Sequence, residues 1–236
     1  MIEITKIKKI IQELDLFFNE KASITKINSG VTNQVFTILD GNKPTYIFRV
    51  YGNNLDSLID RNYENKLIEY LNSNNIGPQI IINFKDYRIE KFINGNTKID
   101  PSQYQHKLGK KILELHQIPI LNKSKCFWKR LDFWVRIIDP PYQTEFNKLA
   151  NYLKDEKQNL FLNEIVLGHG DLCLDNIIIK DEEINLIDFE YSCNLPRPGT
   201  IPKHGPRAVI ILVHQTCRSS FSALSKPILQ ANSNTM

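Results

Sequence analysis

The sequence predicts an α+β protein of two lobes, and two observations support this fold class. The first is a series of short β-type runs between residues 23 and 93, two of which are joined by the strong hairpin signal Asp40-Gly41. The second is a change to mainly helical patterns further along the chain. Because the strands precede the helices, we expect a β-rich part and a separate helical part. The joint is expected near residues 92–100, and ligands often bind at such joints.

The individual elements follow from the spacing of apolar residues. Apolar side chains at positions 7, 10, 11, 14 and 17 recur with the period of an amphipathic helix. Further helices are expected around residues 60–73, 102–117 and 142–158. Strands are expected at residues 23–27, 34–39, 45–51, 79–84, 87–93, 165–167, 177–180 and 184–188.

Composition and cysteine usage restrict the class of protein. The chain has 236 residues, of which 42% are hydrophobic and 24% are charged, as in ordinary soluble domains. No apolar run reaches the roughly 18–20 residues of a membrane span, and the N-terminus lacks the apolar core of a signal peptide. The four cysteines include no Cys-x-x-Cys pair, which argues against a zinc site or a disulfide framework. We therefore expect a reduced, cytoplasmic protein.

The formal net charge of +4 is concentrated in the C-terminal segment. From Tyr191 to Met236 there is no Asp or Glu, but there are five Lys and Arg residues, so the rest of the chain is close to neutral. Because these five residues are scattered, a solvated segment is favoured over a surface that binds nucleic acid or anionic lipid. We expect no nucleic-acid partner and no insertion into a membrane.

The stretch "GHGDLCLDNIII" and the following "INLIDFEY" contain the residues that indicate chemistry. Phosphoryl transfer needs a carboxylate that orients a hydroxyl group and accepts its proton, and it needs oxygen ligands for magnesium. Asp171 fits the first role, and Asn176 with Asp188 fits the second. His169 is expected to brace the loop through hydrogen bonds to the backbone rather than to transfer a proton.

A simpler interpretation is that "HGD" forms a turn and "IDF" ends an ordinary strand. A His-x-Asp pattern alone would favour that interpretation. Here the pattern continues as HxDLxxxN, has an apolar run on each side, and is followed by a second acidic residue after another apolar run. The combination is rare by chance, and it predicts a phosphotransferase.

The same residues resemble a known family. The segment "HGDLCLDNIII…INLIDFEY" resembles the catalytic loop and metal motif of the protein-kinase-like small-molecule kinases, and "DFEY" resembles the choline and ethanolamine kinases. The run from "YIFRVYG" to "YRIEKFI" is similar to that family's "RxYG…R…E…L…GP…F…GRIExF" pattern. The resemblance covers about residues 25–194. It implies a two-lobed protein-kinase-like fold, with a β-rich N-lobe at residues 1–93 and a mainly helical C-lobe part at residues 94–194.

The resemblance also implies an activity. Choline and ethanolamine kinases use magnesium and ATP to phosphorylate the hydroxyl group of a small amino alcohol, which is the first step in the synthesis of phospholipid head groups. ATP and Mg²⁺ are therefore the expected cofactors, and ethanolamine or choline is the expected substrate. Ethanolamine is preferred because "RVYGNNLDSLIDRNYE" is closer to that branch of the family. A homodimer remains open as the oligomeric state.

For the first lobe, the resemblance implies residues that bind phosphate. The segment "NSGVTNQVF" resembles the loop that covers the ATP phosphates, with Gly30, Thr32 and Asn33 at its tip. Arg49 matches a phosphate-binding arginine, which can donate two parallel hydrogen bonds to phosphate oxygens. Glu64, on the next helix, is expected to be the carboxylate partner of Arg49. Without the neighbouring motif, Arg49 would equally be an exposed residue of an edge strand.

Two further groups of residues are expected to contact adenine and the amino alcohol. Glu90 and Phe92 belong to the expected hinge, whose main chain, more than its side chains, would bind adenine. An ammonium group is bound by carboxylates and aromatic faces. Glu190 and Tyr191, together with Asp171, are therefore the expected substrate-binding residues, although a half-buried packing role is an equal alternative for Tyr191.

Residues 195–236 form an atypical tail, because the family resemblance ends after Asn194. Its "LPRPGTIPKHGP" and the following residues contain none of the family's acidic and aromatic motifs, so a truncated C-lobe is expected. Two alternative functions therefore remain. One is a catalytically impaired, nucleotide-binding partner of a full-length kinase. The other is a kinase that acts on another cationic alcohol, similar to the aminoglycoside phosphotransferases.

Overall fold

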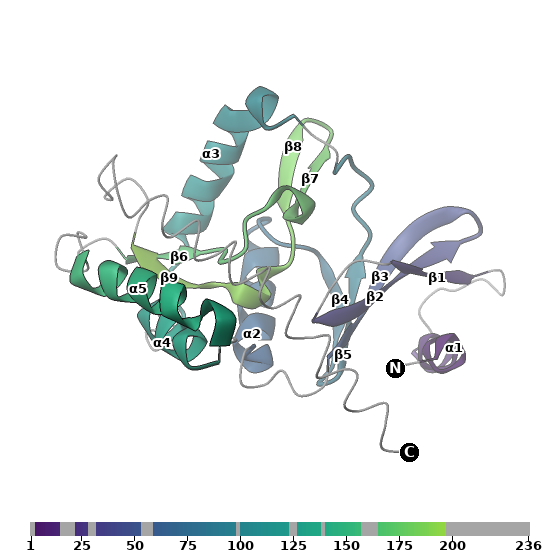
Figure 1. Cartoon of the computed structure of the whole chain (residues 1–236). Coiled ribbons are helices and arrows are strands. Elements are labelled where there is room, and N and C mark those ends of the chain that lie inside the picture. Colours follow the sequence, from purple (N-terminus) through teal and green to yellow (C-terminus); the bar gives the residue numbers. More distant parts are fainter. Residues whose placement is uncertain are drawn as a thin grey trace, which may run out of the picture. The chain divides into compact units, whose positions relative to one another are not determined.

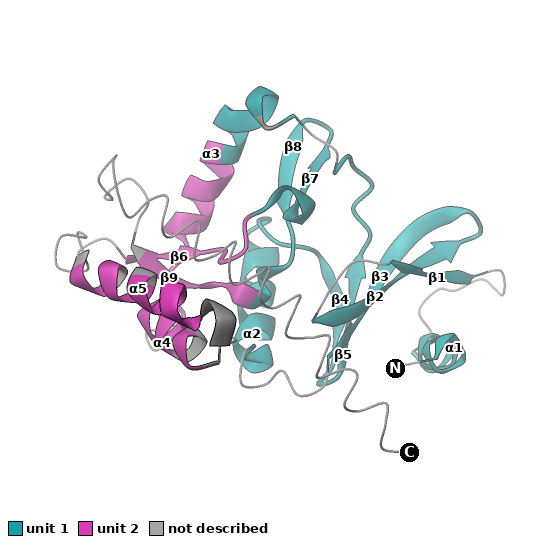
Figure 2. Cartoon of the chain, in the orientation of Figure 1, with its two compact units in different colours: residues 1–108, 173–190 teal, residues 109–172, 191–236 magenta. Residues whose placement is uncertain are grey.

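The structure of the protein, a computed structural model, describes residues 3–14, 22–27, 32–52, 59–97, 100–122, 127–137, 140–156 and 165–196. The chain divides into two compact units, shown in different colours in Figure 2. The first unit consists of Met1–Leu108 and Cys173–Glu190, and the second consists of Gly109–Leu172 and Tyr191–Met236. The predicted catalytic residue Asp171 therefore belongs to the second unit, and the predicted magnesium ligands belong to the first.

A five-stranded antiparallel sheet forms the centre of the first unit (Figure 1). Its strand order is β1-β2-β3-β5-β4. Gly41 has a φ of 61°, a conformation that favours glycine, and it forms the predicted hairpin turn between the second and third strands. All five predicted strands of this region are present. They are β1 (Ser23–Ile27), β2 (Asn33–Asp40), β3 (Lys43–Tyr51), β4 (Ile80–Asn83) and β5 (Tyr87–Lys91).

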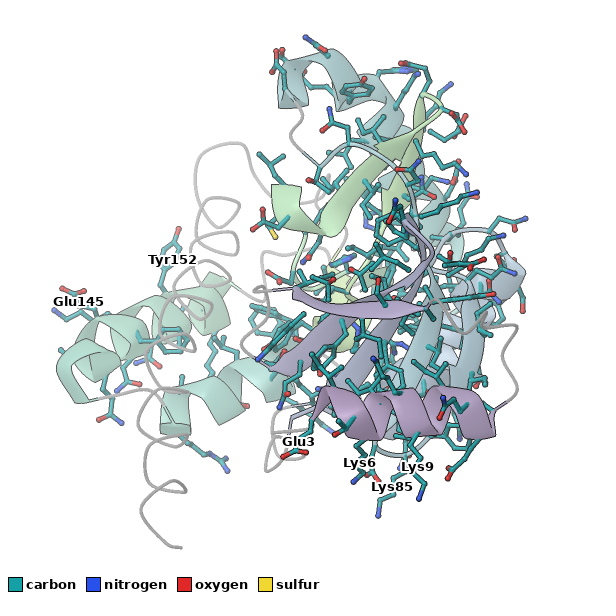
Figure 3. All side chains as sticks on the ribbon, turned by 90° about the vertical axis from the view of Figure 1, so that its right-hand side faces the viewer. Glu3, Lys6, Lys9, Lys85, Glu145 and Tyr152 are labelled. Carbon is teal, nitrogen blue, oxygen red and sulfur yellow. The ribbon has the colours of Figure 1, made fainter. Side chains whose placement is uncertain are left out.

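One face of this sheet is apolar and is covered by helix α1 (Ile4–Glu13). Ile7 and Ile11 are buried in the same cluster as Phe36, Phe48 and Ile89 of the sheet. Lys6 and Lys9 lie on the exposed side of the helix (Figure 3), as its predicted amphipathic pattern requires. Position 17, the last apolar position of that pattern, lies outside the described residues.

The opposite face of the sheet carries charged side chains. Arg88 and Glu90 are two residues apart on β5, so their side chains point to the same face, while Ile89 between them points to the apolar face. Helix α2 (Arg61–Ser73) contributes Glu64 to this charged region. The helix begins where the Asp60 carboxylate accepts a hydrogen bond of 2.9 Å from the backbone N–H of Tyr63.

A small hairpin completes the described part of the first unit. It consists of β7 (Ile177–Lys180) and β8 (Glu183–Leu186), and its turn residues Asp181 and Glu182 have positive φ values of 50° and 65°. Two backbone hydrogen bonds of 2.8 and 2.9 Å join Asn96 to Ile179. The hairpin is therefore attached to the segment that follows the five-stranded sheet.

The second unit contains helices and a two-stranded sheet. Helix α3 (Pro101–Gln117) starts in the first unit and ends in the second, and it is followed by α4 (Phe127–Ile137) and α5 (Pro140–Glu156). β6 (Ile165–Gly168) pairs antiparallel with β9 (Cys193–Pro196), a short strand that the sequence did not predict. Among the described residues, no helix combines the length and apolar character needed to cross a membrane.

Candidate functional site

The loop after β6 holds the predicted catalytic carboxylate. His169 is buried, with 4% of its surface exposed, and its Nδ1 accepts a hydrogen bond of 3.3 Å from the backbone N–H of Asp171. The carbonyl oxygen of His169 accepts a second bond of 3.0 Å from the Ser192 hydroxyl. His169 thus braces the backbone of the loop from both sides, while Asp171 itself is half-buried.

Glycine is required in the middle of this loop. Gly170 has a φ of 81°, and a Cβ atom at this position would overlap the carbonyl oxygen of Tyr191. The backbone of the loop is therefore packed directly against the backbone of residues 191–192. Tyr191, which was expected near the ammonium group of the substrate, is half-buried in this second unit.

The predicted magnesium ligands lie at one end of the β7–β8 hairpin. Asn176 immediately precedes β7 and Asp188 follows β8, and the backbone N–H of Ile187 donates a hydrogen bond of 3.1 Å to the Asn176 carbonyl oxygen. Asp188 has a φ of 66°, and its side chain is 27% exposed. An amide oxygen and a carboxylate oxygen are both donors of the kind that Mg²⁺ takes, so the types of these two residues fit a magnesium site.

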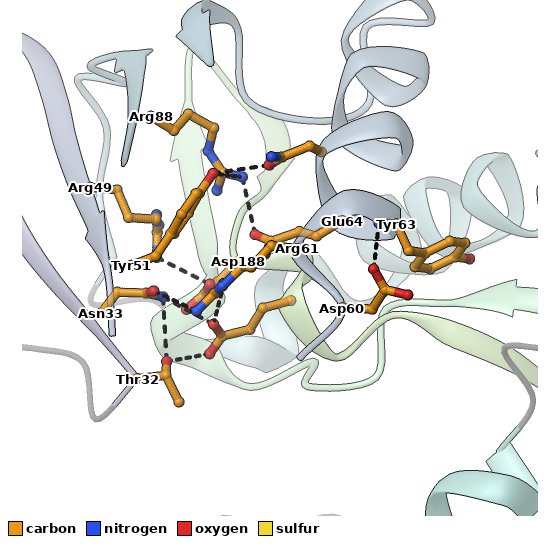
Figure 4. Close-up of polar contacts among 12 residues, drawn as sticks. Thr32, Asn33, Arg49, Tyr51, Asp60, Arg61, Tyr63, Glu64, Arg88 and Asp188 are labelled. Atoms are coloured by element: carbon orange, nitrogen blue, oxygen red, sulfur yellow. Dashed lines mark hydrogen bonds and ion pairs between the residues drawn. The ribbon is translucent and has the colours of Figure 1, made fainter. Parts of the chain in front are cut away.

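Arg49 points into the charged side of the sheet and is not a solvent-exposed residue of an edge strand. It is 6% exposed and lies on β3, which pairs with β2 and β5. Its Nη1 lies 3.2 Å from Asp188 Oδ1 (Figure 4). Its Nε lies 3.3 Å from Glu90 Oε1. The arginine predicted to bind phosphate therefore contacts one of the predicted metal ligands.

The expected pairing of Arg49 with Glu64 is wrong. Glu64 Oε1 accepts from Arg88 Nη1 at 3.0 Å, and Glu64 Oε2 accepts from Arg61 Nη1 at 2.6 Å. Arg88 also donates from Nε to Glu90 Oε1 at 2.7 Å. Arg88 therefore links Glu64 to Glu90, and Glu90 is the residue that pairs with Arg49. The physical reason is the alternation of β5, which brings Arg88 and Glu90 to the same face as Arg49.

The side chain of Glu90, in the expected hinge, is engaged in the charged cluster. Its carboxylate is buried and binds both Arg49 and Arg88. The main chain of the hinge is engaged in the sheet, because the N–H of Lys91 donates to Gln79 O at 2.8 Å and that of Phe92 donates to Thr45 O at 2.9 Å. The contact of this segment with adenine stays a prediction.

Glu190 connects the metal motif to the predicted phosphate loop. Its carboxylate accepts from Thr32 Oγ1 at 2.5 Å and from Asn33 Nδ2 at 2.9 Å. Arg61 Nη1 adds a third bond of 3.1 Å (Figure 4). Gly30, the other predicted residue of the loop tip, lies outside the described residues. The structure therefore buries Glu190 against Thr32 and Asn33 of the predicted phosphate loop, and its contact with an ammonium group stays a prediction.

Burial and neighbouring charges act differently on the three buried glutamates. Burial raises the pKa of Glu190 to about 7, and the nearby carboxylates of Asp188 and Glu64 act in the same direction. Burial also favours the neutral forms of Glu64 and Glu90. However, the guanidinium groups around them outweigh burial and hold the pKa of each below its ordinary value. Glu64 and Glu90 are therefore the firmly ionised members of the cluster.

These lowered pKa values predict a loss of stability in acid. Glu64 and Glu90 have folded-state pKa values below the ordinary value of 4.5, so their contribution is complete above pH 4.5 and is lost as the pH falls through the folded-state values. Glu190 is already protonated in the folded state in that range, because its pKa is raised. Urea unfolding at a series of pH values should show a free energy of unfolding that decreases below pH 4.5.

A Glu90→Gln variant should show a shallower pH dependence in the same experiment, because it lacks one of the two groups. Glu183→Gln is the matched control, since Glu183 is exposed on β8. If the free energy of unfolding falls equally steeply with decreasing pH in the wild type and in Glu90→Gln, the buried cluster is not the cause of this acid sensitivity.

The sequence interpretation missed two members of this cluster, Arg61 and Arg88. Arg88 is fully buried, and Arg61 bridges Glu64 and Glu190. The signal for Arg88 was present in "YRIEK", where Arg and Glu alternate with an apolar residue in a predicted strand. Such a pattern usually indicates a solvent-exposed face, and only the buried opposite charges on β3 and α2 reverse that interpretation.

Comparisons with known proteins agree with these motifs. A profile of the family described as Choline/ethanolamine kinase matches residues 24–204. The match begins within β1 and contains the predicted loop tip, Arg49, the His-x-Asp loop and the metal motif. It also continues beyond Asn194, where the resemblance was expected to end.

Two yeast proteins are among the similar curated proteins. The chain is 25% identical to the ethanolamine kinase of Saccharomyces cerevisiae, in an alignment that covers 72% of this chain and 42% of that protein. It is 30% identical to the choline kinase of the same organism, with 77% of this chain and 32% of that protein covered. The chain thus spans less than half the length of these two relatives.

A solved structure shows the same fold. The choline kinase LicA from Streptococcus pneumoniae matches with a TM-score of 0.71 and 17% sequence identity, covering 92% of this chain and 90% of that one. At this identity the likeness concerns the fold alone. It confirms the predicted α+β class and the protein-kinase-like fold, with an antiparallel sheet in the first part of the chain and helices in the second.

Proposed function

Because this chain belongs to the choline/ethanolamine kinase family, we propose that it uses magnesium and ATP to phosphorylate the hydroxyl group of ethanolamine. Choline is the alternative acceptor. The observation that carries the proposal is the contact of Arg49 with Asp188, next to Asn176. It brings a cation suited to phosphate and two oxygen ligands suited to Mg²⁺ to the same end of the β7–β8 hairpin. The product would be the precursor of a phospholipid head group.

Each residue has a distinct task in this reaction. Bound Mg-ATP would supply the phosphoryl group and neutralise part of its charge. Asn176 and Asp188 would hold the metal ion, and Arg49 would bind phosphate oxygens. Asp171 would orient the substrate hydroxyl and accept its proton while the oxygen forms its bond to the γ-phosphorus. The bond from that phosphorus to the β,γ-bridging oxygen would break, so that ADP leaves. The bond between His169 and the N–H of Asp171 would keep that carboxylate in place.

Further parts of the proposal concern the nucleotide, the head group and the location. Thr32 and Asn33 would contact the phosphates, and the main chain near Phe92 would bind adenine.

Glu190 and Tyr191 would favour a cationic head group through charge and an aromatic face. The family model and the ethanolamine kinase relative support this acceptor class. We place the reaction in the cytosol, in keeping with a cysteine pattern that predicts a reduced protein.

A coupled assay of ADP release tests the proposed activity. It compares ethanolamine, choline, an aminoglycoside and no acceptor, each with Mg-ATP. Release that depends on ethanolamine or choline supports the proposal. Release that depends only on the aminoglycoside would assign the chain to a different acceptor class. Binding of ATP without any acceptor-dependent release would identify an impaired nucleotide-binding partner.

The metal role of Asp188 can be tested separately. In Asp188→Asn we expect a rise in the magnesium concentration that gives the half-maximal rate. Loss of a residue that only hydrogen-bonds to a metal ligand lowers metal affinity by ~10- to 100-fold, and loss of a ligand itself should have a larger effect. The KM for the amino alcohol should change much less, because Asp188 is assigned to the metal. Glu183→Gln, an exposed change on the same hairpin, is the control. An unaltered magnesium dependence of Asp188→Asn would remove this residue from the metal site.

A further inference from the structure

Helix α4 is connected to the catalytic loop by a short series of hydrogen bonds within the second unit. Arg130 on α4 donates from Nη1 to the carbonyl oxygen of Tyr191 and from Nη2 to that of Ser192 at 3.3 Å. The Ser192 hydroxyl donates to the carbonyl oxygen of His169, whose Nδ1 accepts from the N–H of Asp171. Arg130 is therefore linked to Asp171 through two intermediate residues.

The intermediate residues have little freedom to move. Ser192 is 1% exposed and His169 is 4% exposed. The loop is packed so closely on Tyr191 that a single methyl group at Gly170 would overlap the Tyr191 carbonyl oxygen. Any displacement of that carbonyl group would therefore be transmitted to the backbone next to Asp171.

The chemistry of Arg130 suits the two carbonyl groups that it contacts. Its planar guanidinium group can donate to two neighbouring acceptors at once, whereas a lysine offers a flexible point charge. The backbone of α4 is fixed close to Arg130, because the side chains of Phe127 and Leu131 are buried. The guanidinium group thus extends from an anchored helix to the main chain at positions 191 and 192.

We propose that Arg130 is a positioning residue that sets the place of Asp171 through the backbone of Tyr191 and Ser192. Its effect on catalysis rests on the proposed function, in which Asp171 accepts the substrate proton. Arg130 does not itself touch the reacting atoms in this scheme. The residues assigned to phosphate and metal belong to the first unit, so the scheme gives Arg130 no contact with the nucleotide.

Three variants of the full chain test this role: Arg130→Ala, Arg130→Lys and the control Lys129→Met, which changes the exposed neighbouring residue. For Arg130→Ala we expect kcat to fall by about 10²-fold, the loss associated with a misplacement of about 1 Å. The Kd for ATP should stay unchanged. Guanidinium ion at a concentration well below the denaturing range should restore part of the rate of Arg130→Ala. Arg130→Lys should be intermediate, and Lys129→Met should match the wild type.

Hydrogen exchange gives a second readout that does not depend on turnover. The amide protons of residues 169–172 should exchange faster in Arg130→Ala, while those of α4 should keep their protection. Unchanged exchange of residues 169–172 would overturn the proposal even if the chain proves inactive. A lowered kcat accompanied by an equal loss of ATP affinity, or by loss of protection across α4, would indicate a merely structural role and would also overturn it. Absence of acceptor-dependent turnover in the wild type would instead reject the proposed function.

Discussion

Replacing Asp171 with asparagine should lower kcat by about 10²–10⁴-fold, the range that general-base catalysis contributes. Asparagine has nearly the same shape and can keep the backbone bond to His169 Nδ1, but its amide group cannot accept a proton. The affinity for ATP should be unaffected, because the residues assigned to the nucleotide belong to the other unit. The measurement is acceptor-dependent ADP release, together with an equilibrium titration of ATP.

The matched control is Asp175→Asn, which makes the same chemical change on an exposed side chain of the same loop. It should retain the activity of the wild type. If Asp171→Asn turns over like Asp175→Asn, the proton acceptor is a different group. If both variants are inactive but bind ATP normally, the loop as a whole is sensitive to substitution, and the specific role of Asp171 loses its support.

The largest effect on stability is expected from Arg88→Met. Arg88 is fully buried and donates to both Glu64 and Glu90, so its removal leaves two carboxylates in the core without their principal cation. Breaking a buried ion pair from one side typically lowers the free energy of unfolding by about 3–5 kcal/mol. Since domains are stable by only about 5–15 kcal/mol, the variant should lose a large fraction of its free energy of unfolding.

Urea unfolding of Arg88→Met and of Lys91→Met measures this effect. Lys91 lies on the same strand but is exposed, so its replacement should change the urea concentration at the midpoint of unfolding only slightly. A midpoint for Arg88→Met close to that of Lys91→Met would show that the two carboxylates become protonated or hydrated without penalty. The double variant Arg88→Met with Glu64→Gln should recover part of the loss, because it leaves one buried charge fewer.

The fold was predictable wherever local patterns determine it. Alternating apolar residues and Asp40-Gly41 predicted the first hairpin, and the helical period predicted α1 and α2. The turn between β7 and β8 is different, because Asp181 and Glu182 adopt positive φ values without any glycine. β9 was missed because its four residues contain Asn and Pro, and the strand forms through pairing with β6.

The predicted site shows the same division between local and distant information. Asp171, Asn176 and Asp188 could be predicted as site residues because their spacing along the chain is itself the signal. The ion pairs of the first unit were not predicted, because they join residues far apart in sequence, such as Arg49 with Asp188 and Arg61 with Glu190. One-dimensional patterns indicate which residues are charged, but the choice of partner depends on which faces of the sheet and helix are buried together.

Glu64 limits how this protein can change during evolution. Each of its two carboxylate oxygens accepts a hydrogen bond from a different arginine. Arg88 also donates to Glu90, and Arg61 also donates to Glu190. Glutamine would present an N–H group to one of these cations, and aspartate would be shorter by one methylene group. A single substitution at position 64 therefore disturbs the hydrogen bonds of both arginines at once. Divergence here requires coordinated replacement of both arginines, so the three residues should be inherited as a set.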